Sequence, residues 1–231
     1  MLHEFGPRDL LFLLGAARWT VVLSLIACLG GGVLGLVVAL ARISGHVAIR
    51  RVAAAFVRVN QGTPLLILIF IVFFGVAALG WEISAMLAAS ICLVINTGAF
   101  LGEIWAGCIA AIAPGQWQAA AALGLRPYAR MVTVILPQAA RISIPPTVGF
   151  LVHVIKGTSL AALIGFVELS RADQIVNNTT YNPLLVFGTI GLIYFALCWP
   201  LSLASGWLER RMSGPPVTRS TTGSSAATHA G

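Results

Sequence analysis

A lysine followed closely by two hydroxyl residues stands out in a largely apolar chain: Lys156, Thr158 and Ser159. A lysine beside hydroxyls and free backbone N–H groups can bind a carboxylate, as the broken helices of transporters do. A charge at the centre of a membrane helix costs about 2.5–3.5 kcal/mol on insertion scales, so the few that occur mark candidate pathways. The alternative is a lysine that extends to the outer interface. We favour the pathway, and we add Asn96, which could line it or bond to another helix.

Residues typical of a catalytic or metal site are not grouped in this sequence. The four cysteines stand alone in apolar runs, without metal-ligand or CxxC spacing. The histidines are scattered and form no HExxH pattern. No GxxxxGK[ST] phosphate-binding loop occurs, so any ATP must be handled by another chain. We expect no catalytic residue, no metal and no cofactor bound by this chain.

The connection over residues 113–137 predicts a bent pair of short helices. Pro114 can begin the first, because its missing N–H would have no partner there. Gly124 can end it in a left-handed conformation, and Pro127 can begin the second. Alanines at 119–122 would let another protein approach the backbone closely. Two arginines that flank them could pair with carboxylates of that protein: Arg126 and Arg130. The alternative is a helix lying on the bilayer with its arginines extended to water.

Composition places these residues in a membrane protein. Hydrophobic residues make up 58% of the chain and charged residues only 9%, whereas soluble domains carry about 25% charged residues. A spanning helix needs about 20 mostly apolar residues. We therefore predict an all-α membrane protein with about five transmembrane helices. The expected spans are residues 19–41, 63–79, 83–112, 138–155 and 184–208.

Basic residues predict the orientation of these spans. Most of them follow the first, third and fifth spans, whereas Arg8, Arg18, Lys156 and Arg171 lie on the other side. The positive-inside rule then places the N-terminus outside and the C-terminus in the cytoplasm. The net charge of +7 therefore reflects topology, and we expect no nucleic-acid partner. We divide the chain into an outer or interfacial N-terminus (1–18, with 10–17 at the interface), a transmembrane domain (19–212) and a disordered cytoplasmic tail (213–231).

Small residues and acidic residues give weaker expectations. GxxxG spacing at Gly31 and Gly35, and again at Gly98 and Gly102, would let helices approach closely in lipid. Glu103 is expected to pair with a basic side chain, with Arg58 and Arg141 as the partners considered. Three charged residues lie between the fourth and fifth spans: Glu168, Arg171 and Asp173. They could contact a partner protein or be solvated, and we slightly favour solvation.

The 113–137 segment resembles the EAA motif of permeases in the ATP-binding cassette importer superfamily. That motif reads Glu-Ala-Ala, three residues, Gly, nine residues, an aliphatic residue, one residue, then Leu-Pro. The chain matches this spacing at Gln118, Ala119, Ala120, Gly124, Val134, Leu136 and Pro137. Gln118 replaces the glutamate, which keeps the shape and removes the charge. Position 118 therefore offers no salt bridge, while we still expect docking.

Other segments resemble the polar amino acid branch of that superfamily, in the same order along the chain. Residues 60–66 resemble its Arg-Gly-Thr-Pro-Leu-Leu segment, with Gln61 in place of arginine and Thr63 retained. Residues 96–104 resemble an Asn-Ser-Gly-Ala-Tyr segment that ends in Glu-Ile, and residues 156–160 resemble Lys-Asp-Thr-Ser-Leu, with Gly157 in place of aspartate. Residues 164–169 and 200–203 also match. The resemblance adds Gln61 and Thr63 to the candidate pathway.

The resemblance implies a type I importer permease fold in the bacterial inner membrane. Its cytoplasmic helix pair, the coupling helices, would dock on an ATPase subunit that holds ATP and magnesium. A second permease, identical or related, and a periplasmic solute-binding protein would complete the transporter. Because Gly157 offers no carboxylate to a cationic substrate, we expect a neutral or acidic amino acid. A permease for opines, sulfur compounds or another amino-acid-like solute is a further possibility.

Two functions of other classes are alternatives to transport: an autonomous channel and a membrane-embedded enzyme. An autonomous channel would have no reason to carry a docking motif. A membrane-embedded enzyme would need paired carboxylates or a His–Ser arrangement, and the expected spans contain neither.

Overall fold

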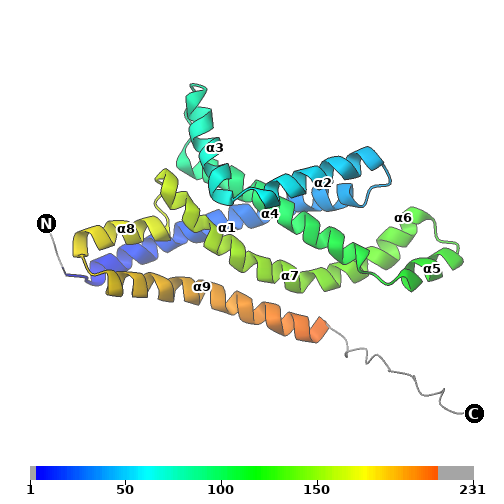
Figure 1. Ribbon diagram of the computed structural model, residues 1–231. Coiled ribbons are helices and arrows are strands. Elements are labelled where there is room, and N and C mark those ends of the chain that lie inside the picture. The colour runs from blue at the N-terminus through cyan, green and yellow to red at the C-terminus, as the bar shows by residue number, and fades with distance from the viewer. Residues whose placement is uncertain (1–3, 213–231) are drawn as a thin grey trace, which may run out of the picture.

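The structure is a computed structural model that describes residues 4–212. The predicted tail at 213–231 therefore lies outside the described residues. Within 4–212 the regular elements are all helical, in agreement with the predicted class (Figure 1). In chain order they are α1 (Pro7–Arg42), α2 (Val47–Gly62), α3 (Leu65–Ala78), α4 (Ala85–Ala110), α5 (Pro114–Ala122), α6 (Pro127–Arg130), the π-helix η1 (Met131–Ile135), α7 (Leu136–Gly157), the 3₁₀-helix η2 (Thr158–Ile164), α8 (Leu169–Thr180) and α9 (Pro183–Met212).

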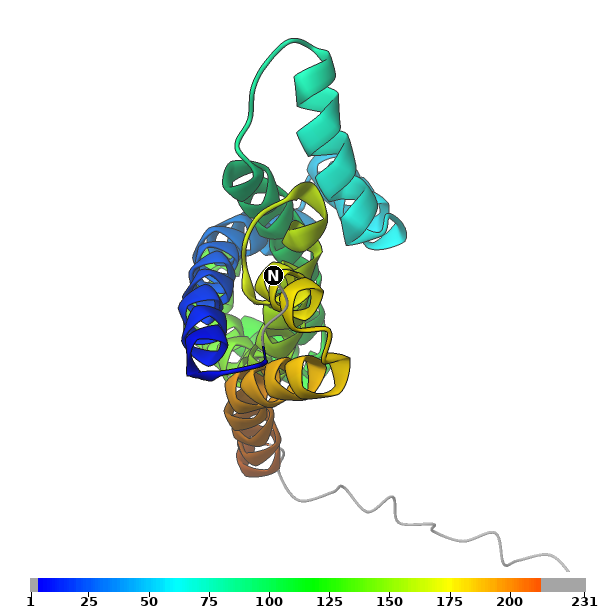
Figure 2. The ribbon, with the colours of Figure 1, turned by 90° about the vertical axis from the view of Figure 1, so that its left-hand side faces the viewer.

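Four helical stretches are long and apolar enough to cross a membrane: Pro7–Arg42, Ala85–Ala110, Pro127–Ile164 and Pro183–Met212. A fifth candidate is the pair α2 and α3, which is bent by 97°. The sequence expectation of about five spans is confirmed on this count. The predicted second span, however, is a helix of only 14 residues, about 21 Å long, which is shorter than the ~30 Å hydrocarbon core. Figures 1 and 2 show α3 projecting from the body of the molecule, beyond the break at Pro64.

Helix α1 extends further towards the N-terminus than the expected first span. It begins at Pro7, and the backbone N–H of Gly6 donates to the Asp9 carboxylate at 2.9 Å. Residues 10–17 continue this helix, so no break separates them from the apolar run that follows. Leu13 and Ala16 are buried against α8 and α9. The N-terminal part of α1 is thus held by packing against α8 and the start of α9.

The close approach of α1 and α4 depends on the two glycine pairs that have GxxxG spacing. A Cβ on Gly35 would lie 2.9 Å from Leu101 Cβ and 3.3 Å from the carbonyl oxygen of Gly98. A Cβ on Gly102 would lie 2.5 Å from Val38 Cγ1 and 3.2 Å from the carbonyl oxygen of Gly35. The glycines therefore let the two backbones touch, and the expected role of this spacing is confirmed.

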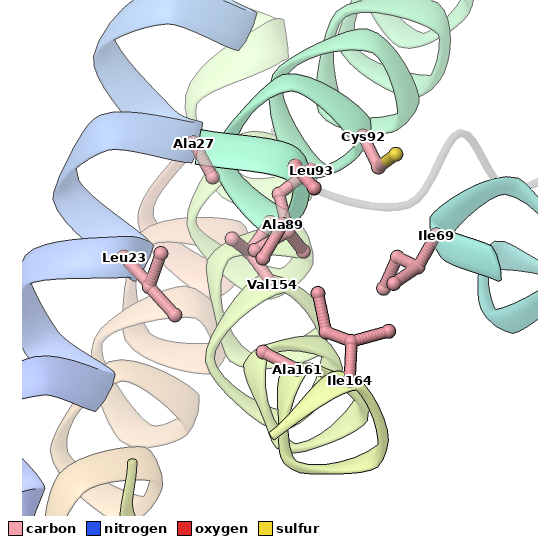
Figure 3. Packing of buried hydrophobic residues seen from close by; sticks show 10 residues of the cluster. Leu23, Ala27, Ile69, Ala89, Cys92, Leu93, Val154, Ala161 and Ile164 are labelled. Atoms are coloured by element: carbon pink, nitrogen blue, oxygen red, sulfur yellow. The ribbon is translucent and has the colours of Figure 1, made fainter. Parts of the chain in front are cut away.

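A cluster of buried apolar residues joins α1, α3, α4, α7 and η2. Figure 3 shows Leu23 and Ala27 of α1 facing Ala89 and Leu93 of α4, with Ile69 of α3 on the far side. Val154, Ala161 and Ile164 of the α7–η2 stretch complete this cluster. This packing holds the C-terminal end of α7 against α1, α3 and α4.

Candidate functional site

The 113–137 segment forms the bent helix pair that the sequence predicts. Pro114 begins α5, Pro127 begins α6, and Gly124 between them has φ +75°. The N–H of Gly124 donates to the carbonyl of Ala121 at 2.9 Å, and that of Leu125 donates to Ala120 at 3.3 Å. These two bonds satisfy carbonyls that would otherwise be left unpaired at the end of α5. The predicted left-handed turn is confirmed.

One face of α5 is attached to the body and the other is exposed. Ala120 is buried, and Trp117 packs against a cluster that contains Ile112 and Ile135. Gln118 and Ala119 are exposed. Two large residues of the turn and of α6 are each 80% exposed: Leu123 and Tyr128. A pair of short helices with exposed apolar side chains is typical of a surface that binds another protein.

The two arginines of this segment differ in their surroundings. Arg130 is half-buried, and its Nη2 donates to the carbonyl oxygen of Leu125 at 3.4 Å. Its Nε is buried without a partner in the part of the chain that the structure describes. Arg126 is exposed. Arg130 thus stabilises the turn from within, and Arg126 is the one of the pair that faces outwards.

Leu136 and Pro137 lie where the helix pair joins the long helix. Leu136 begins α7 directly after the π-helix η1, and Pro137, which has no N–H to donate, follows it within one continuous helical stretch. Leu136 packs against Ile135 and Ala139 in the same cluster as Trp117. The helical stretch Pro127–Ile164 therefore connects the helix pair directly to the residues around Lys156.

The Lys156 segment differs in detail from the sequence expectation. Lys156 is exposed at the end of α7, as a binding role requires. Thr158 is fully buried and its hydroxyl donates to the carbonyl of Ile155 at 2.8 Å. Ser159 is partly exposed and its hydroxyl donates to the carbonyl of Lys156 at 2.7 Å. Both hydroxyls donate to carbonyls of their own helix, but only Ser159 is accessible, so Lys156 and Ser159 form the accessible pair.

The candidate segment that carries Gln61 and Thr63 lies near this helix end. A Cβ on Gly157 would be in ordinary contact with Leu65 Cδ2 at 3.5 Å and Leu93 Cδ2 at 3.8 Å. The break between α2 and α3, which carries Thr63, therefore lies beside the end of α7. Thr63 donates to the carbonyl of Val59 at 2.8 Å, while Gln61 is exposed.

Asn96 is buried on α4, and one turn further along that helix begins an aromatic stack. Phe100 of α4 stacks on Phe150 of α7 with ring centroids 5.2 Å apart, and Phe150 stacks on His153 at 5.6 Å. His153 precedes Lys156 by three residues and therefore shares its helix face. The sequence analysis missed His153, although this i, i+3 spacing could have indicated it.

Glu103 is paired, but with an arginine that the sequence analysis did not consider. Arg42 Nε and Nη2 donate to its two carboxylate oxygens at 2.9 and 2.8 Å. This bidentate pair joins the end of α1 to α4. The expectation of a basic partner is confirmed, and the choice of Arg58 or Arg141 is wrong because the C-terminal part of α1 packs closely on α4, which brings Arg42 to Glu103.

The expectation of solvated charges between the fourth and fifth spans is wrong for Glu168 and Asp173. Glu168 is fully buried as the N-cap of α8, and Asp173 is also buried. The Glu168 carboxylate accepts from Ser170 N at 2.8 Å, from Arg171 N at 3.1 Å, from Thr20 Oγ1 at 3.3 Å and from the Tyr194 hydroxyl at 3.2 Å. Burial raises the pKa of Glu168 despite these hydrogen bonds, which act in the opposite direction.

Replacement of Glu168 tests whether this cluster stabilises the packing of α8 on α1 and α9. Glu168→Ala should destabilise the protein by about 3 kcal/mol or more, because an unpaired buried donor costs about 1–3 kcal/mol. Glu168→Gln can accept the same two backbone N–H bonds and should stay close to the parent. Because the folded pKa is raised, the stabilising protonated form is lost as pH rises through that pKa. Thermal unfolding in detergent across pH should show this decline in the parent and not in Glu168→Gln. Equal stability of Glu168→Ala and the parent would contradict the role.

The family model described as "Binding-protein-dependent transport system inner membrane component" matches residues 31–214. The chain belongs to this family of inner-membrane transport components.

Several relatives match most of the length of this transport component. It is 34% identical over 193 residues to the probable amino-acid ABC transporter permease protein YckA of Bacillus subtilis, covering 84% of this chain and 85% of that protein. It is 35% identical over 199 residues to the L-cystine transport system permease protein TcyB of the same organism, covering 86% and 85%. It is 33% identical over 202 residues to the glutamine transport system permease protein GlnP of Escherichia coli K12, covering 87% and 92%.

Solved structures share the fold of this transport component. The crystal structure of an amino acid ABC transporter with histidines has a TM-score of 0.82 at 31% identity, covering 87% of this chain and 94% of that one. An inward-facing MetNI methionine ABC transporter has a TM-score of 0.75 at 19% identity, covering 91% and 100%. The predicted type I importer permease fold is confirmed.

Proposed function

We propose that this transport component is the permease subunit of an ATP-driven importer for a neutral or acidic amino acid. The observation that carries the proposal is the exposed α5–α6 pair, with its left-handed turn at Gly124, at one end of an apolar helical bundle. ATP and magnesium would be bound by a separate ATPase that docks on this pair. A second permease, identical or related, and a periplasmic solute-binding protein complete the assembly. The names of the relatives support an amino acid as the solute.

The docking surface follows from the exposed side of α5 and α6. Gln118 and Ala119 offer a small, uncharged contact at which a groove of the ATPase can approach the backbone. Leu123 and Tyr128 supply exposed apolar area, and Arg126 supplies a cation for a carboxylate of the ATPase. Gln118 can accept or donate a hydrogen bond but cannot form a salt bridge.

This surface would face the cytoplasm, with the N-terminus in the periplasm. The arginine-rich start of α2 follows the end of α1, and Ile43 packs in the same cluster as Trp117 of α5. Both basic segments therefore lie at one end of the bundle, opposite the N-terminus and α8 (Figure 1). The positive-inside rule supports this end as the cytoplasmic one.

Coupling would run through the helical stretch Pro127–Ile164. Its first residues belong to the docking pair, and its last residues carry Lys156 and Ser159. A displacement of α6 by the ATPase would therefore move the Lys156 end of the same stretch. Trp105 Nε1 of α4 donates to Thr147 Oγ1 at 3.0 Å, so α4 would follow this movement.

The C-terminal end of α7 would select substrates by their charge. Lys156 is exposed there and can bind a substrate carboxylate, while Gly157 leaves no carboxylate to bind a cationic side chain. Asn96, Gln61 and Thr63 remain candidates for the same pathway.

Two substitutions test this assignment by uptake of labelled amino acids into proteoliposomes. Lys156→Gln should lower uptake about 10- to 100-fold, since a hydrogen bond to a charged group contributes about 1.5–3 kcal/mol. Gly157→Asp has room for its Cβ and should raise competition by arginine and lysine. Arg18→Gln, which removes an exposed charge elsewhere, should leave uptake unchanged.

The competitor panel decides the substrate class. Inhibition by neutral or acidic amino acids supports the proposal, and stronger inhibition by opines or sulfur compounds would redirect it within transport. Arginine or lysine outcompeting all neutral and acidic compounds in the parent protein would overturn the assignment. Uptake that needs no ATPase would instead indicate a channel.

A further inference from the structure

A hollow lined by arginines lies where α2 packs near the end of α1. It has a volume of about 440 Å³ and is lined by Arg42, Arg50, Arg51, Ala54, Ala55 and Arg58. Arg51 and Arg58 are seven residues apart on α2, so they project from the same helix face two turns apart. The short side chains of Ala54 and Ala55 between them leave the space open. We call this cavity the arginine hollow.

The positive charge of the arginine hollow is only partly neutralised. Arg42 forms the bidentate pair with Glu103, and Arg50 Nη1 donates to the carbonyl oxygen of Ser44 at 3.3 Å. Arg51 and Arg58 have neither a hydrogen bond nor an ion pair within residues 4–212. Arg50, Arg51 and Arg58 therefore line one hollow without a carboxylate partner within residues 4–212. Like charges that line one hollow favour the binding of an anion.

The surface beside the arginine hollow is apolar. Val52 is 71% exposed and Val59 is 66% exposed, and each directly follows one of the two unpaired arginines. Val47 and Ile49 at the start of α2 are exposed as well. An arginine row beside a row of aliphatic side chains matches a ligand that has an anionic head and a hydrocarbon body. A free phosphate or an acidic soluble protein would leave the aliphatic row in water.

We infer that the arginine hollow binds the phosphate of an anionic phospholipid, whose acyl chains lie along Val52 and Val59. A guanidinium group can donate two N–H bonds to the oxygens of one phosphate. Arg51 and Arg58, on either side of the alanines, can both do so. Basic pockets between helices at the cytoplasmic side of a membrane recognise such headgroups. The site is separate from the α5–α6 docking pair and goes beyond the proposed function. It would make the α2 segment sensitive to the lipid composition of the membrane.

The test measures binding of fluorescent phosphatidylglycerol in phosphatidylcholine nanodiscs. The nanodiscs contain the purified full-length protein together with any subunits that co-purify with it. The double variant Arg51→Gln, Arg58→Gln should raise the half-saturating lipid fraction about 25-fold. Each arginine is expected to contribute about fivefold, and the two factors multiply. Arg210→Gln with Arg211→Gln removes the same charge from exposed positions on α9 and should change binding less than twofold. Equal weakening by both double variants would overturn the proposal, because binding would then depend on charge alone.

A second variant guards against loss of folding. Ala55 is exposed and lies four residues after Arg51 and three before Arg58, so Ala55→Glu can form helix ion pairs with both and should not destabilise α2. It should nevertheless abolish lipid binding, because a carboxylate then occupies the hollow. Persistence of binding in Ala55→Glu would contradict the site. Displacement of the lipid by millimolar inorganic phosphate would show a free-anion site and overturn the lipid assignment.

Discussion

Gly102→Ala is expected to destabilise the helix bundle by about 2–3 kcal/mol, the upper part of the range for overpacking a well-packed interior. The added methyl group would lie 2.5 Å from Val38 Cγ1 and 2.7 Å from Val38 Cβ. A valine cannot move its Cβ without moving its backbone, and the carbonyl of Gly35 lies 3.2 Å away on the same side. Helices α1 and α4 must therefore separate. The ion pair between Arg42 and Glu103, which joins the two helices, should weaken when they separate.

Gly107→Ala is the matched control on the same helix. No atom lies within 4 Å of a Cβ built there, so the change should be neutral or stabilise the protein by up to about 1 kcal/mol through helix propensity. Thermal unfolding of both variants in detergent checks the difference. If Gly102→Ala melts with the parent, the close approach of α1 and α4 is not as the structure has it.

Gly124→Val is expected to uncouple the protein from its ATPase and to lower solute-stimulated hydrolysis at least tenfold. The residue has φ +75°, a conformation that costs an ordinary residue about 1–2 kcal/mol and a β-branched one more. The turn would relax to another conformation and change the angle between α5 and α6. Because an added Cβ meets no neighbour within 4 Å, the loss would come from the backbone and not from a clash.

Gly124→Asn separates these effects at the same position. Asparagine tolerates the left-handed conformation, so this variant should keep most of the coupling despite its larger side chain. ATPase assays of the purified complexes, with co-purification of the ATPase as a second readout, make the comparison. Full activity of Gly124→Val would show that the left-handed turn is not needed. Equal loss in both variants would assign the effect to side-chain bulk at the docking surface.

The features that the sequence analysis predicted well depend on local chemistry. Pro114, Gly124 and Pro127 each restrict the backbone by themselves, so the helix pair could be placed without knowledge of the fold. The spans followed from hydrophobic runs in the same way. Helix α2 was missed because Arg50, Arg51 and Arg58 interrupt any such run. The residues that α2 buries, Ala53, Ala54, Val57 and Asn60, are covered because α2 packs on α1 and α4.

The features that could not be predicted depend on distant partners. Thr20 donates to Glu168 across 148 positions of the chain, and Tyr194 donates to it across 26. Nothing near Glu168 in the sequence shows that these partners will exclude water from it. The glycine spacing similarly predicted close approach but did not reveal that Gly35 and Gly102 meet each other. Which accessible group accompanies Lys156 was also a matter of packing, because Thr158 turns into the core.

The most direct test of the account is the ATPase rate of the affinity-purified complex in liposomes. The rate is measured with the co-purifying solute-binding protein, in the presence and absence of a panel of amino acids. The account predicts that an ATPase chain co-purifies and that neutral or acidic amino acids stimulate hydrolysis through the binding protein. Purification of the chain alone under gentle extraction, with no associated ATPase activity, would contradict it.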